Sequence, residues 1–146
     1  MNYRLLCCSD THGQLPPALC EQGATAWLHG GDAMHGPAAV DDDEPIDPLL
    51  DPLRAPIARW FMERPIPVYI VRGNHDIADD FAAFQHASDV GGFVRQIAPR
   101  LFVAGIGWHG EKYFELPRES DLEPMCQQVI RQATRLVGLS EPDGRQ

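Results

Sequence analysis

Residues 67–71, PVYIV, and residues 72–76, RGNHD, form the stretch on which the rest of the chain depends. The first five residues are apolar and mostly β-branched or aromatic, which is typical of a buried strand. Gly73 then permits a sharp turn, because it has no Cβ to clash. Three polar residues follow this glycine, namely Asn74, His75 and Asp76. Since open α/β sheets bind ligands at the carboxyl ends of their strands, the stretch predicts a strand that delivers an amide, an imidazole and a carboxylate to one site.

Two earlier stretches show the same order of an apolar run followed by a polar turn. They are residues 5–13, LLCCSDTHG, and residues 26–32, AWLHGGD. Asp10 and His12 are two residues apart, so in an extended backbone both side chains point to one side and can hold one cation. Asp32 follows the second apolar run. Three strand ends with oxygen or imidazole donors predict one shared metal site.

The segments between these strands have the end signals or the spacing of helices. Residues 15–23 have prolines near their start and Gly23 at their end, which favours a short helix. In residues 55–63, apolar side chains recur at helical spacing before Pro65. Strands that alternate with helices predict parallel strands joined by crossover helices, so the fold class is α/β.

The second half of the chain is predicted to add two helices and two strands. Residues 79–87 form a short helix, residues 93–97 and 101–106 form adjacent strands, and a long amphipathic helix begins near Asp121. The whole chain is predicted to form one domain, 1–146, which is long enough to bury a core.

Residues 36–53 differ from the rest of the chain, because they combine six acidic residues with several prolines. We expect an acidic, proline-rich loop insertion, exposed to solvent over the rim of the site. The spacing of its carboxylates does not match an EF-hand loop, so a calcium site there is the weaker interpretation.

The overall charge argues against a broad nucleic-acid surface. The chain has 21 acidic and 12 basic residues and a formal net charge of -9. A metal pocket can still attract a phosphate group locally, since bound ions are the largest charges in such a site. Net charge therefore leaves small phosphate esters open as substrates.

The compartment is predicted from cysteine usage and targeting signals. Four cysteines form no Cys-x-x-Cys pair and are expected to be buried free thiols in a reducing cytosol: Cys7, Cys8, Cys20 and Cys126. No signal peptide precedes the first strand, and no apolar run approaches the roughly 20 residues of a membrane span. The sequence therefore predicts a cytoplasmic protein without a membrane partner.

The three polar turns are more specific as an ordered set than separately. A pattern such as Asp-x-His is expected about 0.5 times by chance at this composition, whereas Gly-Asn-His is expected about 0.007 times. Unrelated turn residues are the alternative, because Asp, Asn and Gly are common after strands. The set consists of DTH at residues 10–12, GD at residues 31–32 and GNHD at residues 73–76.

This ordered set resembles the calcineurin-like metallophosphoesterase family, over residues 5–108. The resemblance implies a β-sandwich core with flanking helices and a two-metal site at the carboxyl ends of its strands. Asp10 and His12 would bind the first metal, Asp32 would bridge both metals, and Asn74 would bind the second. His75 would be the catalytic residue, which donates a proton to the leaving oxygen or stabilises it.

Such a site would hydrolyse phosphate mono- or diesters. Two divalent ions about 3.5–4 Å apart can clamp the attacking and leaving oxygens, and a bound water loses its proton near neutral pH to become a hydroxide nucleophile. Mixed oxygen and nitrogen donors suit Mn, Fe or Zn without choosing among them. The substrate class is left open among protein phosphates, nucleotides, diphosphates and phosphodiesters.

The sequence departs from the family in two places. His35 stands where the family often has an aspartate that orients the catalytic imidazole, so His35 is a candidate for contact with substrate phosphate. Asp76 is a candidate for supporting the ligands from behind. The family's later histidine motifs are absent, since no histidine follows His109. The domain is therefore expected to lack its carboxyl-terminal part, to expose an apolar edge at residues 101–106 and to self-associate.

Three hypotheses follow from these observations. The first is a metal-dependent phosphoesterase, or the amino-terminal portion of one. The second is a truncated or degenerate relative that binds one metal ion or a phosphate ligand without turnover. The third is a site that histidines from another chain complete. A chain that acts alone is expected to show one metal site and weak or no hydrolysis.

Overall fold

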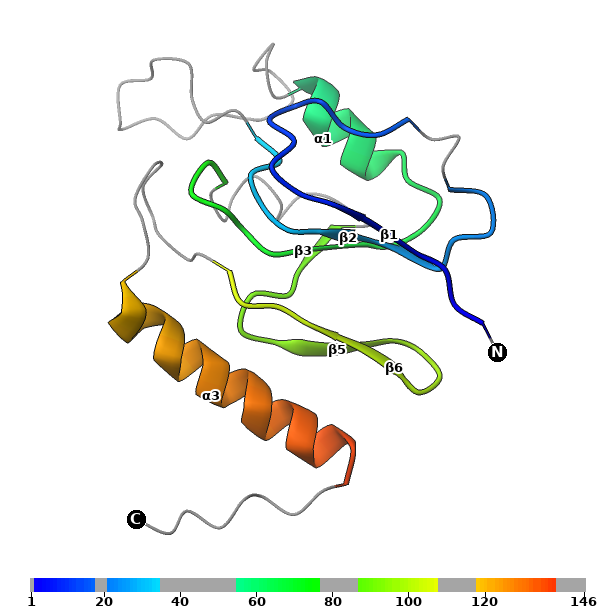
Figure 1. Ribbon diagram of the computed structural model, residues 1–146. Helices are drawn as coiled ribbons and strands as arrows, with labels where there is room; N and C mark the ends of the chain where they lie inside the picture. The colour runs from blue at the N-terminus through cyan, green and yellow to red at the C-terminus, as the bar shows by residue number, and fades with distance from the viewer. Residues whose placement is uncertain (1, 18–20, 35–54, 77–86, 108–117, 139–146) are drawn as a thin grey trace, which may run out of the picture.

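Figure 1 shows the computed structural model, which describes residues 2–17, 21–34, 55–76, 87–107 and 118–138. This part of the chain forms a mixed α/β fold with a parallel sheet, an antiparallel hairpin and two helices. In chain order the elements are β1 (Leu5–Cys8), β2 (Ala26–His29), α1 (Ala55–Met62), β3 (Val68–Ile70), β4 (Ala87–Asp89), β5 (Val94–Ala98), β6 (Leu101–Ala104) and α3 (Glu119–Leu136).

The parallel sheet has the strand order β1-β2-β3-β4. In its register, Cys8 of β1 lies opposite His29 of β2, and His29 lies opposite Ile70 of β3. The parallel pairing that the alternating apolar runs predict is therefore confirmed. Because these strands run in the same direction, their carboxyl ends share one edge, and the three polar turns leave the sheet there.

The core lies between one face of this sheet and α1, which covers that face in Figure 1. The core includes large apolar side chains that are almost fully buried: Trp27, Met34, Ile57, Phe61, Val68 and Ile70. The strand residues among them share a face, since side chains alternate along a strand. Ile57 and Phe61 are four residues apart, so they lie on one side of α1.

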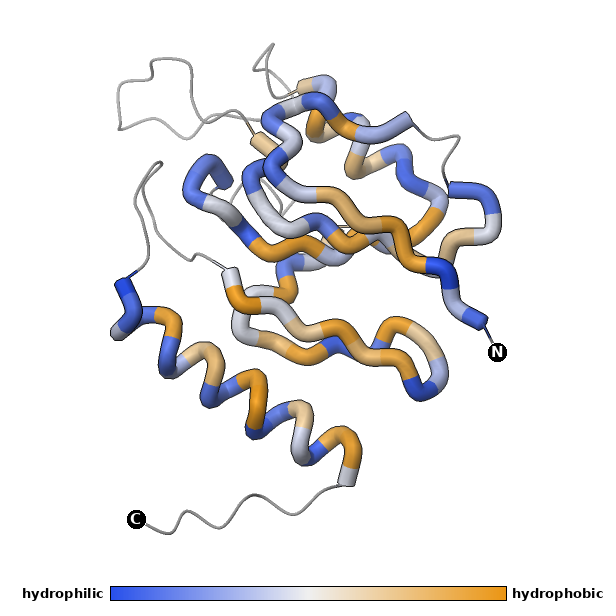
Figure 2. Tube along the Cα trace, viewed as in Figure 1, coloured by the Kyte–Doolittle hydropathy of each residue, from blue (hydrophilic) through white to orange (hydrophobic). Residues whose placement is uncertain are grey.

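The hairpin β5–β6 forms a second layer, and α3 runs beside it (Figure 1). Gln132 joins α3 to the start of the hairpin, because its side-chain oxygen accepts the Val94 N–H at 2.9 Å and its amide donates to the Gly92 carbonyl at 3.4 Å. Figure 2 shows hydrophobic residues along the strands of both sheets and hydrophilic residues in several of the turns between them. The two sheets with their flanking helices confirm the predicted class, and β5, β6 and α3 begin within two residues of their predicted positions.

A cavity of about 470 Å³ lies between the parallel sheet and β6. Its lining includes Cys7, Leu28, Tyr69 and Val103. The prediction of buried thiols is wrong for Cys7, which is exposed because it points away from the face that α1 covers. Cys7, Cys8 and Cys126 are free thiols, and Cys8 and Cys126 are partly buried. Cys20 lies outside the described residues.

The helix predicted at residues 15–23 is not found at residues 15–17, which have no helical structure. Glu21 has a 3₁₀-helical conformation and residues 22–23 form a turn, while residues 18–20 lie outside the described residues. Two successive prolines, Pro16 and Pro17, carry no backbone N–H and so cannot add donors to a helical ladder. The Pro16 carbonyl instead accepts a hydrogen bond from the Trp60 indole at 2.8 Å.

Strand β4 was not predicted, and it begins at Ala87, where the sequence pattern had placed the end of a helix. The rest of that helix, residues 79–86, and the acidic loop 36–53 lie outside the described residues. Asp89 holds β4 in place, because its carboxylate accepts the Arg72 Nε–H at 2.8 Å and the Gly91 N–H at 2.8 Å. In the described ranges, neither helix is long and apolar enough to cross a membrane.

Candidate metal centre

The turns after β1 and β2 run side by side beyond the ends of their strands. The Asp10 N–H donates to the Gly31 carbonyl at 2.8 Å, and the His12 N–H donates to the Asp32 carbonyl at 3.0 Å. These backbone bonds extend the parallel pairing into the loops. They bring the side chains of two sequence motifs to one place.

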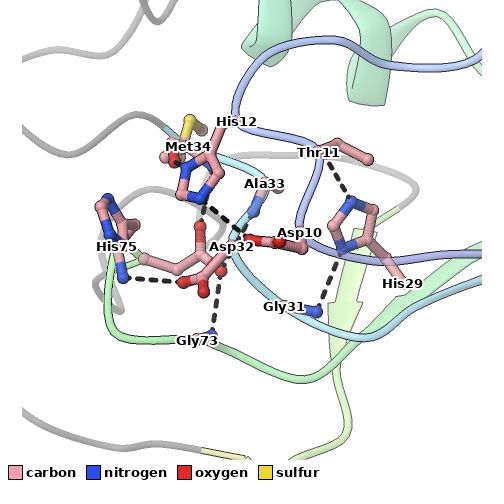
Figure 3. A network of polar contacts seen from close by, with 11 residues as sticks. Asp10, Thr11, His12, His29, Gly31, Asp32, Ala33, Met34, Gly73 and His75 are labelled. Atoms are coloured by element: carbon pink, nitrogen blue, oxygen red, sulfur yellow. Dashed lines mark hydrogen bonds and ion pairs between the residues drawn. The ribbon is translucent and has the colours of Figure 1, made fainter. Parts of the chain in front are cut away.

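Three of the predicted ligands meet there, namely Asp10, His12 and Asp32. One donor atom from each lies within 4.8 Å of the others, and His12 Nε2 is 2.9 Å from Asp10 Oδ1 (Figure 3). At that distance a protonated imidazole forms an ion pair with the carboxylate. A divalent cation would take the place of the proton, since metal ligands bind in their deprotonated form.

The orientation of the His12 ring fits a metal ligand. Its Nδ1 lies 3.2 Å from the Met34 carbonyl, which can only accept a hydrogen bond, so Nδ1 carries the proton. Nε2 is then left to face the carboxylates. Metal-binding histidines typically donate their other N–H to a carbonyl or carboxylate in this way, which fixes the tautomer and raises the basicity of the ligand.

The backbone of all three residues is left-handed, with φ of 53° at Asp10, 41° at His12 and 53° at Asp32. This conformation is uncommon outside glycine, although Asp and His adopt it more often than most residues. The expectation that Asp10 and His12 alternate as in a strand was therefore wrong, because β1 ends at Cys8. The two side chains converge because the backbone curls. Such strained residues concentrate at functional sites.

The third turn supplies backbone contacts to Asp32. The His75 N–H donates to Asp32 Oδ1 at 2.9 Å. Gly73 packs directly against the same carboxylate, and a Cβ at this position would collide with the side chain of Asp32 and lie 2.7 Å from its backbone nitrogen. The glycine of the Gly-Asn-His motif therefore makes room for Asp32, a predicted ligand of another motif.

The ring of His75 lies beside that of His12, with centroids 4.5 Å apart and planes at 76° (Figure 3). The structure thus brings His75 next to the three ligands. Asn74 precedes it in the same turn and is half-buried. His35 and His109 lie outside the described residues.

Asp76 is buried and connects the second turn to the third. Its carboxylate accepts the N–H groups of Met34 at 2.9 Å, Gly73 at 3.0 Å and Ala33 at 3.4 Å. Burial is the main influence and raises the pKa of Asp76, while these three hydrogen bonds act in the opposite direction. Asp76 therefore links the turn after β2 to the turn after β3 through hydrogen bonds to their backbones.

We expect Asp76→Ala to lower the free energy of unfolding by about 3 kcal/mol, because three backbone donors lose a buried acceptor. Asp76→Asn keeps one acceptor oxygen and should lose less. Urea denaturation of the metal-free protein measures both, with Glu123→Ala, an exposed carboxylate on α3, as the control. A loss for Asp76→Ala no larger than that of the control would contradict the role assigned to Asp76.

Comparison with known families decides where this chain belongs. Residues 3–136 match the family model described as calcineurin-like phosphoesterase. The chain is a member of that family. Searches of curated proteins and of solved structures found no match.

Membership in the calcineurin-like phosphoesterases confirms the resemblance seen in the three motifs. The family is one of metal-dependent phosphoesterases, and the group of Asp10, His12 and Asp32 is a candidate for holding a divalent ion. The meeting of these three residues could be predicted because each follows a parallel strand. Two residues that contact the turns, Thr11 and Met34, could not be predicted, since no pattern in the sequence distinguishes them.

Proposed function

We propose that this protein hydrolyses phosphate mono- or diesters at a metal centre on the carboxyl edge of its parallel sheet. The observation that carries the proposal is the meeting of Asp10, His12 and Asp32 within 4.8 Å, with Nε2 of His12 turned toward the carboxylates. Asp10 and His12 would hold a first divalent ion. Asp32 would bridge to a second ion, which Asn74 would also bind.

The protein groups around the ions have separable tasks. The carboxylate of Asp32 would offset the charge of two cations, and its position is fixed by the His75 N–H and by the close approach of Gly73. The imidazole of His75 would donate a proton to the leaving oxygen, or stabilise it, and its position beside the ring of His12 supports this role. The ions themselves would supply Lewis-acid polarisation of the phosphoryl group and an activated water at neutral pH.

One observation favours a second candidate, a relative that binds one ion without turnover. Within the described ranges, Asp10, His12 and Asp32 are the one group of three His, Cys, Asp or Glu donors found close together. The second ion would have two oxygen donors from the described residues, Asp32 and Asn74. One ion can polarise a phosphoryl oxygen, but it cannot clamp both the entering and the leaving groups.

Metal content and hydrolysis, measured on the same gel-filtration fraction, test the proposal. Two metals per chain with turnover of an aryl phosphate would support the binuclear enzyme. One metal without turnover would support the second candidate, and no metal after separate incubations with Mn²⁺, Fe²⁺ and Zn²⁺ would overturn both. Loading with Mn, Fe and Zn separately identifies the preferred ion, since mixed nitrogen and oxygen donors suit all three.

Two further properties are part of the proposal. We place the protein in the cytoplasm, because the cysteines in the described ranges are free thiols, as expected in a reducing compartment. We also expect self-association through exposed apolar side chains, which include Ile106, Ile130 and Val137. The elution volume in the same gel filtration measures it.

A further inference from the structure

The imidazole of His29 contacts both ligand-bearing turns. His29 ends β2 and is 3% exposed. Its Nδ1 accepts the Gly31 N–H at 3.2 Å, and its Nε2 lies 3.0 Å from Oγ1 of Thr11 (Figure 3). Gly31 immediately precedes Asp32, and Thr11 lies between Asp10 and His12.

We propose that His29 is a positioning residue that ties the two turns together, one ring nitrogen to each, and thereby sets the affinity of the metal centre. This inference rests on the proposed function, since it assigns His29 a role toward the ion that Asp10, His12 and Asp32 would hold. His29 itself is not a ligand, because both of its nitrogens are engaged by the turns.

The hydrogen bonds fix the tautomer of the ring. A backbone N–H can only donate, so Nδ1 must present its lone pair to Gly31. The proton of the neutral ring is therefore on Nε2, which donates to the Thr11 hydroxyl. A doubly protonated ring would direct a second N–H at the Gly31 donor and break this contact.

The surroundings keep the ring neutral and in place. Burial lowers the pKa of His29 to about 4, and the charge of Asp32 opposes this shift only in part. The ring of Phe61 lies beside it, with centroids 6.3 Å apart. At neutral pH, the neutral ring of His29 is therefore held in a fixed orientation, with one hydrogen bond to each turn.

The contacts of His29 can affect metal affinity because the backbone at the predicted ligands is strained. A left-handed conformation at a non-glycine residue costs of order 1–3 kcal/mol and persists only when the surroundings enforce it. Asp10, His12 and Asp32 all adopt it. The backbone bonds between the turns fix their spacing, and His29 adds a side-chain link at the residue beside each ligand.

A double-mutant cycle in Mn²⁺ affinity tests the link. Thr11→Val and His29→Asn each remove the contact between Nε2 and Oγ1, because an asparagine amide reaches only the position of Nδ1. We expect each to weaken Mn²⁺ binding by about 10-fold, within the range seen when residues that support metal ligands are changed. The double variant should bind no more weakly than either single variant, and additive losses would overturn the inference.

Two more variants distinguish the hydrogen bonds of His29 from the packing of its side chain. His29→Leu removes both contacts and should bind Mn²⁺ most weakly, whereas His29→Gln can still reach Thr11 and should recover part of the loss. Thr25→Val, at the residue that immediately precedes β2, is the matched control and should bind as the wild type does. Equal affinities for His29→Leu and the wild type would overturn the inference.

Measurements on the metal-free protein keep the inference separate from the proposed function. Nitrogen NMR of the imidazoles at pH 7 should show His29 as one tautomer, with the proton on Nε2. The Gly31 amide should exchange its hydrogen more slowly in the wild type than in His29→Leu or His29→Gln. A proton on Nδ1, or unchanged exchange, would overturn the tie. Failure of the wild type to bind any of Mn²⁺, Fe²⁺ and Zn²⁺ would overturn the proposed function, while the NMR and hydrogen-exchange measurements would still decide whether His29 links the two turns.

Discussion

His75→Ala is expected to lower kcat for an alkyl phosphate by about 10²–10⁴-fold and to leave the metal content unchanged, which is the usual range for loss of a general acid. The centroids of the His75 and His12 rings are 4.5 Å apart, so the His75 side chain lies beside the predicted ligands. The bond to Asp32 comes from the backbone of residue 75, so alanine retains it. Removal of the His75 side chain should therefore abolish proton donation to the leaving oxygen and leave metal binding unchanged.

Two substrates with different leaving groups test this interpretation, once hydrolysis by the wild type has been measured. An alkyl leaving oxygen needs the proton, whereas an activated aryl leaving group departs without it. The loss in kcat for His75→Ala should be much larger for the alkyl ester. Equal losses on both substrates would rule out proton donation, and loss of metal would show that the ring supports the ligands instead.

Asp32→Asn is expected to weaken Mn²⁺ binding more than any other single substitution at the centre, and by more than the 10–100-fold typical of a supporting residue. Its carboxylate is the group that would touch both ions, so its charge is lost from both. Asparagine also tolerates the left-handed backbone that residue 32 adopts, with φ of 53°. Asp32→Asn therefore removes the negative charge of the side chain without disfavouring the backbone conformation of the turn.

Asp10→Asn is the matched comparison for Asp32→Asn. Residue 10 has the same φ of 53°, so the two variants differ in the position of the lost charge and not in the backbone they require. Titration of Mn²⁺ into both metal-free proteins, with urea denaturation as a check on folding, measures the difference. A smaller loss for Asp32→Asn than for Asp10→Asn would contradict bridging by Asp32.

The grouping of the ligands could be predicted from the sequence because parallel strands bring their carboxyl ends together. Each of Asp10, Asp32 and His75 follows an apolar run, and a buried strand is what such a run predicts. Strand β4 could not be found in this way, since its sequence, ASD, has little preference for a strand. The contact between Asp89 and Arg72 stabilises it, and that contact joins residues 17 apart.

The details of the site depend on contacts that no local pattern encodes. The left-handed turns at Asp10 and Asp32 are held by hydrogen bonds between the loops, such as the Asp10 N–H to the Gly31 carbonyl. His29 is buried at the end of β2, and its two polar contacts with Thr11 and Gly31 form only when the two turns are in place. Tertiary contacts of this kind override the extended spacing that the sequence predicted.

The left-handed backbone at Asp10, His12 and Asp32 also limits how the candidate metal centre can change during evolution or in the laboratory. Valine, isoleucine and threonine are penalised at these positions by their backbone alone, whatever their effect on the ion. Asparagine, aspartate and histidine are the side chains that combine tolerance of this conformation with donor atoms for a metal. Few side chains can therefore replace the predicted ligands at these three positions, and we expect substitutions in the residues that contact the turns to change the metal preference more readily.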